Sequence, residues 1–134
     1  MRYFCPKCWS DFAEDLALCP QCGQDIGAFW KAKDYVEKLI AALDHPEQET
    51  PIRAAWILGK LRDERAVEPL INLIDRTRDV YIASAAVEAL GLLGAPQARE
   101  FLRGVAANHP AAMVRELART AVSGSPEPSV ERMT

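Results

Sequence analysis

The sequence lacks any apolar run of about 18 residues, the length at which a membrane-spanning helix is expected. Aromatic residues are also scarce, at 7% of the 134 residues, whereas hydrophobic residues as a whole make up 49%. Alanine and leucine dominate that fraction, which favours helices over sheets and can still bury a core. Basic residues are fewer than acidic ones, with 16 Lys and Arg against 19 Asp and Glu. The resulting net charge of −3 argues against a nucleic-acid partner.

Catalytic motifs are missing as well. The sequence has no Gly-rich phosphate loop, and no Ser-His-Asp, Cys-His or paired-carboxylate arrangement can be assembled, so we expect a protein that is not an enzyme. No apolar stretch follows Arg2 at the N-terminus, which does not fit a secretory signal, so we expect a cytoplasmic protein. Thiols stay reduced there, and four cysteines in two close pairs indicate a metal site more readily than disulfides.

The cysteines form two CxxC pairs, Cys5 with Cys8 and Cys19 with Cys22. In each pair two thiolates of one tight turn can reach the same ion, and two such turns complete a tetrahedral four-sulfur site that suits zinc or iron. A redox CxxC needs a βαβ unit, which is not present. A segment this short cannot fold on its own hydrophobic burial, so metal binding has to supply on the order of 10 kcal/mol. We predict one structural zinc ion, because four thiolates leave no open position for water or substrate.

Residues 3–25, with their two Cys-Pro-x-Cys turns, resemble the short zinc-ribbon modules found at the termini of many bacterial and archaeal proteins. The resemblance implies a small β-hairpin ribbon. The family usually has glycine after the second cysteine, as Gly23 follows Cys22 here, but Trp9 follows Cys8. We interpret this indole as packing against the neighbouring domain, the alternative being an exposed contact. Rubredoxin has similar turns with a much longer spacer, which leaves iron-based electron transfer as a weak alternative.

From about Ala28 onward the apolar residues follow the 3.6-residue period of a helix. Tyr35, Leu39, Ile40 and Leu43 are expected to share one face of a first helix. The sequence then repeats itself: residues 54–61 match residues 86–93 after 32 positions, and residues 118–122 continue the series. A period of this length predicts an α-solenoid of helix pairs, in which each pair buries its face against its neighbours.

Several residues mark where these helices begin and end. Thr50 is expected to cap the first helix of the first repeat, Asp79 that of the second, and Asp63 stands at the start of a second helix. Gly59 and Gly91 fall near the ends of first helices, where a tight turn or a close helix approach needs no side chain.

Residues 53–63 followed by 66–71 look like a near-consensus copy of the short HEAT-like repeat of the phycobilisome-lyase type. The repeat that begins at Ile82 resembles a second copy, and the one that begins at Val114 keeps only its first helix. The resemblance covers residues 34–123 and implies the fold, whereas repeats of this kind occur in proteins of many functions. We therefore predict a mainly α protein, a short HEAT-like helical-repeat solenoid with a small N-terminal β zinc ribbon.

The chain divides into three predicted parts. A zinc ribbon spans residues 1–27, and a HEAT-like domain of a leading helix, two full repeats and a terminal half-repeat spans 28–123. The tail, 124–134, has a linker composition and is predicted to be disordered. Because the open ends of a solenoid need covering, the aromatics Trp9, Phe29 and Trp30 lead us to expect the ribbon to dock on the N-terminal end.

Three further residues have two possible roles each, one structural and one in binding. His45 and His109 occupy equivalent turns, and we interpret both as turn residues before a proline rather than as ligands. Trp56 falls at the repeat position held by Glu88 and Thr120, which indicates an outward-facing site. An indole more often fills a seam between helices, and the alternative is an anchor for a partner.

The leading functional hypothesis is a non-catalytic module or scaffold whose repeats bind another protein. In HEAT-like folds the second helices usually line the concave side, so Glu68, Asn72 and Arg103 are the polar candidates for partner contacts, together with Trp56. The resemblance leaves a phycobilisome-lyase-like chromophore–protein lyase, or its accessory subunit, as the alternative. A nucleic-acid-binding HEAT-like protein comes third, because the negative net charge predicts no salt-dependent binding to a duplex.

Overall fold

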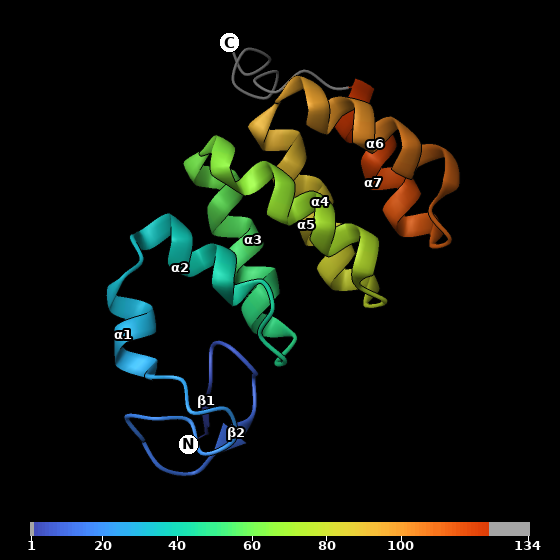
Figure 1. Ribbon diagram of the computed structural model, residues 1–134. Coiled ribbons are helices and arrows are strands. Elements are labelled where there is room, and N and C mark those ends of the chain that lie inside the picture. Colours follow the sequence, from blue (N-terminus) through green and yellow to red (C-terminus); the bar gives the residue numbers. More distant parts are fainter. Residues whose placement is uncertain (1, 124–134) are drawn as a thin grey trace.

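The computed structural model describes residues 2–123, so the predicted tail lies outside the described residues. The chain begins with two short antiparallel strands, in which Tyr3 pairs with Phe12 and Phe4 with Asp11. Seven α-helices follow within the described residues (Figure 1). In chain order the elements are β1 (Tyr3–Phe4), β2 (Asp11–Phe12), α1 (Ile26–Lys31), α2 (Tyr35–Ala42), α3 (Glu49–Leu61), the 3-10 helix η1 (Glu64–Ala66), α4 (Val67–Arg76), α5 (Val80–Leu93), α6 (Pro96–Asn108) and α7 (Ala112–Ser123).

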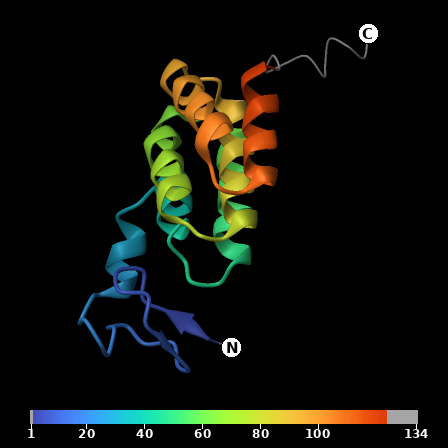
Figure 2. The same ribbon diagram turned by 90° about the vertical axis from the view of Figure 1, so that its right-hand side faces the viewer.

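Helices α2 to α7 form two layers. In the first layer α3 packs against α5 and α5 against α7, and the second layer consists of α2, α4 and α6. Across the layers α2 packs on α3, α4 on α5 and α6 on α7, which makes three helix pairs. The two strands lie beyond one end of these helices, near the turn between α2 and α3 (Figure 2). The predicted fold class, a mainly helical repeat solenoid with a small N-terminal β segment, is confirmed.

Two glycines set the spacing of the first layer. A Cβ atom built on Gly59 would lie 2.9 Å from the Cα of Ala89, and one on Gly91 would lie 3.0 Å from the Cβ of Ala121. Both pairs recur after 32 residues, so the same close approach joins α3 to α5 and α5 to α7. The prediction that these glycines permit close packing of helices is confirmed.

The core lies between the two layers. Leu58, Leu70 and Leu90 are fully buried there, one each from α3, α4 and α5. The prediction that Tyr35 belongs to the buried face of the leading helix is wrong, because its side chain is 59% exposed. Tyr35 is the first residue of α2, and the buried face of that helix starts one residue later, at Val36.

The residues that cap the helices agree only in part with those predicted from the sequence. Asp79 caps α5 as predicted, because its carboxylate accepts hydrogen bonds from the first turn of that helix. The prediction that Thr50 caps α3 is wrong, since α3 begins at Glu49 and Thr50 lies inside its first turn. The preceding residue, Gln48, makes no side-chain bond to α3 and instead donates its amide to the Asp79 carboxylate at 2.6 Å. This bond links the starts of two neighbouring first-layer helices.

Candidate functional site

The two CxxC turns of the N-terminal segment (residues 2–25, hereafter the cysteine segment) have matching backbone geometry. The N–H of Trp9 donates to the carbonyl of Cys5 at 2.8 Å, and the N–H of Gly23 donates to that of Cys19 at 2.9 Å. Both donors have a positive φ, 63° at Trp9 and 80° at Gly23. Glycine adopts this left-handed conformation freely, whereas it costs another residue about 1–2 kcal/mol. Trp9 therefore occupies a glycine position at a cost in conformational energy.

These turns bring the four cysteine sulfurs together. The Sγ atoms of Cys5 and Cys22 lie 3.5 Å apart, those of Cys8 and Cys19 lie 3.6 Å apart, and all four lie within 4.8 Å of one another. Metal–sulfur bonds of about 2.3 Å in a tetrahedron separate the sulfurs by about 3.8 Å. The predicted ligands are thus placed together, in an arrangement compatible with one metal ion.

Backbone amides point at the buried sulfur of each pair. The N–H of Lys7 donates to the Sγ of Cys5 at 3.3 Å, and the N–H of Gln21 donates to the Sγ of Cys19 at 3.3 Å. Hydrogen bonds to the charged form of a group favour that form, so these amides stabilise thiolates. The second cysteine of each pair is exposed at the surface.

The two exposed thiols, those of Cys8 and Cys22, differ in how readily they ionise. Hydrogen bonds with the side chain and backbone of Ser10 lower the pKa of Cys8 to about 6. The backbone bond with Gln24 favours the Cys22 thiolate, but partial desolvation and the neighbouring sulfurs raise the pKa of Cys22 to about 11. Negative charges this close oppose one another, and a bound cation removes the conflict by deprotonating coordinating thiols. The donor set therefore fits a metal ion.

Two aromatic side chains of the first CxxC turn contact the helical domain. The rings of Phe4 and Trp9 lie against the imidazole of His45, with centroid distances of 4.4 Å and 5.0 Å. The interpretation that Trp9 packs on the neighbouring domain is confirmed. Phe29 and Trp30 instead contact each other edge to face, with a centroid distance of 5.2 Å. Sequence reasoning missed Phe4, and its position directly before the first cysteine was the available signal.

His45 and His109 are turn residues, as predicted. The Nδ1 atom of His45 accepts a hydrogen bond from the N–H of Glu47 at 3.1 Å, and that of His109 accepts one from the N–H of Ala111 at 3.0 Å. Burial lowers the pKa of His45, so the neutral ring is favoured.

The first layer exposes large apolar side chains. Trp56 is 58% exposed, so it faces outward as its repeat position indicated, and the favoured interpretation that it fills a seam between helices is wrong. The ammonium of Lys60 lies 4.8 Å from its ring centroid, one turn further along α3. Within residues 2–123, the exposed large hydrophobic residues of α3, α5 and α7 are Trp56, Leu61, Tyr81, Leu92 and Met113.

A family model for HEAT repeats matches residues 36–123, which is most of the chain and covers the helices α2 to α7. The chain belongs to the HEAT-repeat family. None of the curated proteins matches it. The matched family is HEAT repeats in general, and the match does not include the cysteine segment.

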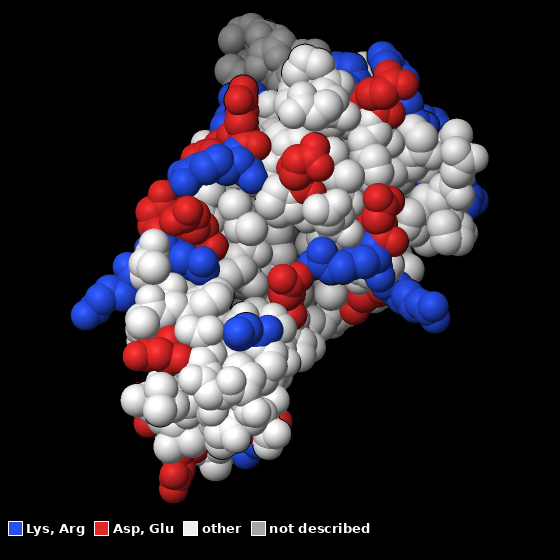
Figure 3. Space-filling view, viewed as in Figure 1, with Lys and Arg blue, Asp and Glu red and all other residues white. Residues whose placement is uncertain are grey.

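The polar candidates lie in the second layer of the HEAT repeats. Glu68 and Asn72 are exposed on α4, and Arg103 is exposed on α6, where it bonds Glu100 at 2.9 Å. The structure does not bring them together with Trp56, which belongs to the first layer. Figure 3 shows positive and negative side chains interleaved over one face of the molecule, without a stripe of a single sign. Of the described residues, no helix is long and apolar enough to cross a membrane.

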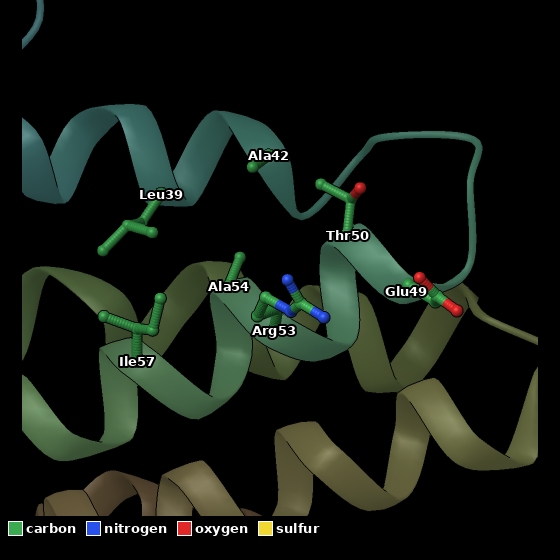
Figure 4. Close-up of a pocket in the computed structure, with 7 residues that line it drawn as sticks. All are labelled: Leu39, Ala42, Glu49, Thr50, Arg53, Ala54 and Ile57. Carbon is green, nitrogen blue, oxygen red and sulfur yellow. The ribbon is translucent and has the colours of Figure 1, made fainter.

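The cysteine segment does not cover the whole N-terminal end of the repeats. A shallow groove lies between α2 and α3 (Figure 4). Its apolar residues are Leu39, Ala42, Ala54 and Ile57, and its polar residues are Glu49, Thr50 and Arg53. The segment contacts the turn that joins these helices, so the predicted docking is found at the turn, while the groove itself is open.

Proposed function

We propose that this protein is a non-catalytic interaction module whose HEAT repeats bind another protein through the outward side of the first layer. The observation that carries the proposal is the register of the exposed apolar residues. Tyr81 and Met113 lie 32 residues apart, at one repeat position, and Leu92 lies 32 residues after Lys60. Equivalent positions on neighbouring helices point to the same side, and Trp56 lies about two helical turns after Glu49, the α3 counterpart of Tyr81, so these side chains and Trp56 form one surface.

The chemistry of this surface supports protein binding. Exposed apolar patches mark interaction sites, and tryptophan and tyrosine are enriched among the residues that dominate binding energy. Lys60 and Glu88 on the same layer would supply a polar rim. The second layer exposes charged and polar residues instead, and Glu68, Asn72 and Arg103 would be the contacts of the alternative interface on that layer.

We further propose that the cysteine segment is a zinc ribbon with one structural zinc ion held by Cys5, Cys8, Cys19 and Cys22. The sulfur distances and the amide donors support a closed four-thiolate site, which has no position for substrate. Elemental analysis of the purified chain should find one zinc per molecule and no visible absorption from iron. Iron at this stoichiometry, or no metal, would contradict the assignment.

Site-directed photo-crosslinking tests the interaction surface. A photoreactive phenylalanine analogue at position 56 or 81 should trap the same protein in cells, and the analogue at position 103 should not. Each variant must keep the helical circular dichroism of the parent. Equal trapping from position 103, or none from positions 56 and 81, would reject the first layer as the interface.

A further inference from the structure

We propose that metal binding in the cysteine segment and docking of that segment on the HEAT repeats are coupled through the contact of Phe4 and Trp9 with His45. The proposal rests on the metal site of the proposed function. It adds that the ion fixes the position of the segment on the repeats as well as folding it.

The two rings belong to the turn that holds the metal ligands. Phe4 directly precedes Cys5, and Trp9 directly follows Cys8. The N–H of Trp9 closes this turn on the carbonyl of Cys5 at 2.8 Å. Any event that tightens or loosens the turn therefore moves both rings.

Comparison of the two CxxC turns shows that the indole is not needed for the turn itself. Gly23 closes the second turn in the same left-handed conformation without strain. Trp9 bears the strain, and its ring lies 5.0 Å from that of His45. The contact with the repeats offsets the strain, so the residue at this position serves docking.

On the side of the repeats, the His45 ring is held in place by a hydrogen bond within its own turn. The Nδ1 atom of His45 is bonded to the N–H of Glu47, which fixes the ring in the connection between α2 and α3. Pro6, which lies between the two cysteines of the same CxxC turn, lines a shallow hollow with Ile40 and Ala41 of α2. The first CxxC turn therefore faces α2, and the ring contact with His45 bridges it to the repeats.

Linkage makes the coupling reciprocal: if the ion favours the docked state, docking raises the affinity for the ion by the same factor. The two aromatic contacts together are expected to change the affinity for the ion by a factor on the order of ten. In the absence of metal the turn loosens, the rings leave His45, and the connection between α2 and α3 loses its cover.

The test uses the full chain and a matched pair of histidine variants. His45→Ala and His109→Ala each remove one Nδ1 hydrogen bond of the same kind, but only His45 contacts the cysteine segment. In competition with a chromophoric chelator, His45→Ala should bind zinc about tenfold more weakly than the parent, and His109→Ala should bind it equally well. Equal affinity of all three proteins would overturn the coupling, whereas failure of the parent to bind zinc would overturn the metal site itself.

Hydrogen exchange gives a second readout. Removal of zinc from the parent should speed amide exchange in residues 43–49, and the same removal from His45→Ala should leave their faster exchange unchanged. Trp9→Gly keeps all four ligands and relieves the positive φ, so it should still bind zinc, but the zinc-dependent protection of residues 43–49 should be weaker than in the parent because only Phe4 remains against His45. Zinc-dependent protection in Trp9→Gly as strong as in the parent, or exchange in the parent that zinc does not alter, would refute the proposal.

Discussion

Replacement of Gly59 by alanine tests the close packing of the first layer. The added Cβ would lie 2.9 Å from the Cα of Ala89, 3.1 Å from its Cβ and 3.2 Å from the Cδ1 of Leu92. A leucine methyl can rotate away, but the Cα belongs to the backbone of α5, so α3 and α5 must move apart. Overpacking of this kind costs about 1–3 kcal/mol.

Gly104 supplies the matched control. It lies inside α6, and a Cβ there would meet nothing within 4 Å. Gly104→Ala should therefore stabilise the protein by about 1 kcal/mol, the helix propensity of alanine over glycine. In Gly59→Ala the same gain offsets part of the clash, so we expect a net loss of about 1 kcal/mol and a difference of about 2 kcal/mol between the variants.

Urea and thermal unfolding followed by circular dichroism measure both effects. For a domain of this size about 1 kcal/mol corresponds to roughly 4–8 °C in Tm, so the two variants should shift in opposite directions. Gly91→Ala should lie between them, because its Cβ meets only the side chain of Ala121 at 3.0 Å and the backbone at 3.8 Å. If Gly59→Ala stabilised the protein as much as Gly104→Ala, the close approach of α3 and α5 would be wrong.

Three further predictions concern single side chains. Asp79→Ala should cost about 1 kcal/mol and speed exchange at the start of α5, because it removes the cap; unchanged exchange there would contradict the capping role. The N–H of Glu37 and the Arg65 guanidinium lower the pKa of Asp34, so the ionised carboxylate stabilises the fold above the ordinary aspartate pKa and this contribution is lost as pH falls through the lowered value. In Asp34→Asn the free energy of unfolding, measured with urea, should fall less steeply at acid pH than in the parent. An unchanged dependence on acid pH would count against the ion pair. Cys22→Ser should abolish tight metal binding and the exchange protection of residues 2–25 while α3 to α7 stay helical, and retained tight binding would show that three thiolates suffice.

The repeat architecture could be predicted from the sequence because it depends on periodicity. Residues 54–61 and 86–93 match at a fixed spacing, and Gly59 and Gly91 keep the same packing role in both copies. The four-cysteine cluster could be predicted for a different reason. Each CxxC turn is local, so the spacing alone places two sulfurs together, and only the meeting of the two turns depends on the fold.

Features that depend on contacts between distant segments could not be predicted. Thr50 has the right chemistry for a cap, but Gln48 is drawn to Asp79 of the next helix pair and the helix starts earlier. The contact of Phe4 with His45 joins two modules, and no period or motif links those positions. The outward position of Trp56 was available from its repeat position, which Glu88 and Thr120 share, but the general tendency of indoles to be packed favoured a seam instead.

The central claim is that the first layer of the HEAT repeats recognises the partner, and the affinity of single-site variants for the crosslinked partner tests it most directly. Calorimetric titration of Trp56→Ala should show a loss of at least about tenfold, because a tryptophan at the centre of an interface contributes about 2 kcal/mol or more. Arg103→Ala, on the second layer, should bind within about twofold of the parent. A strong loss with Arg103→Ala and none with Trp56→Ala would place the interface on the other layer and contradict the account.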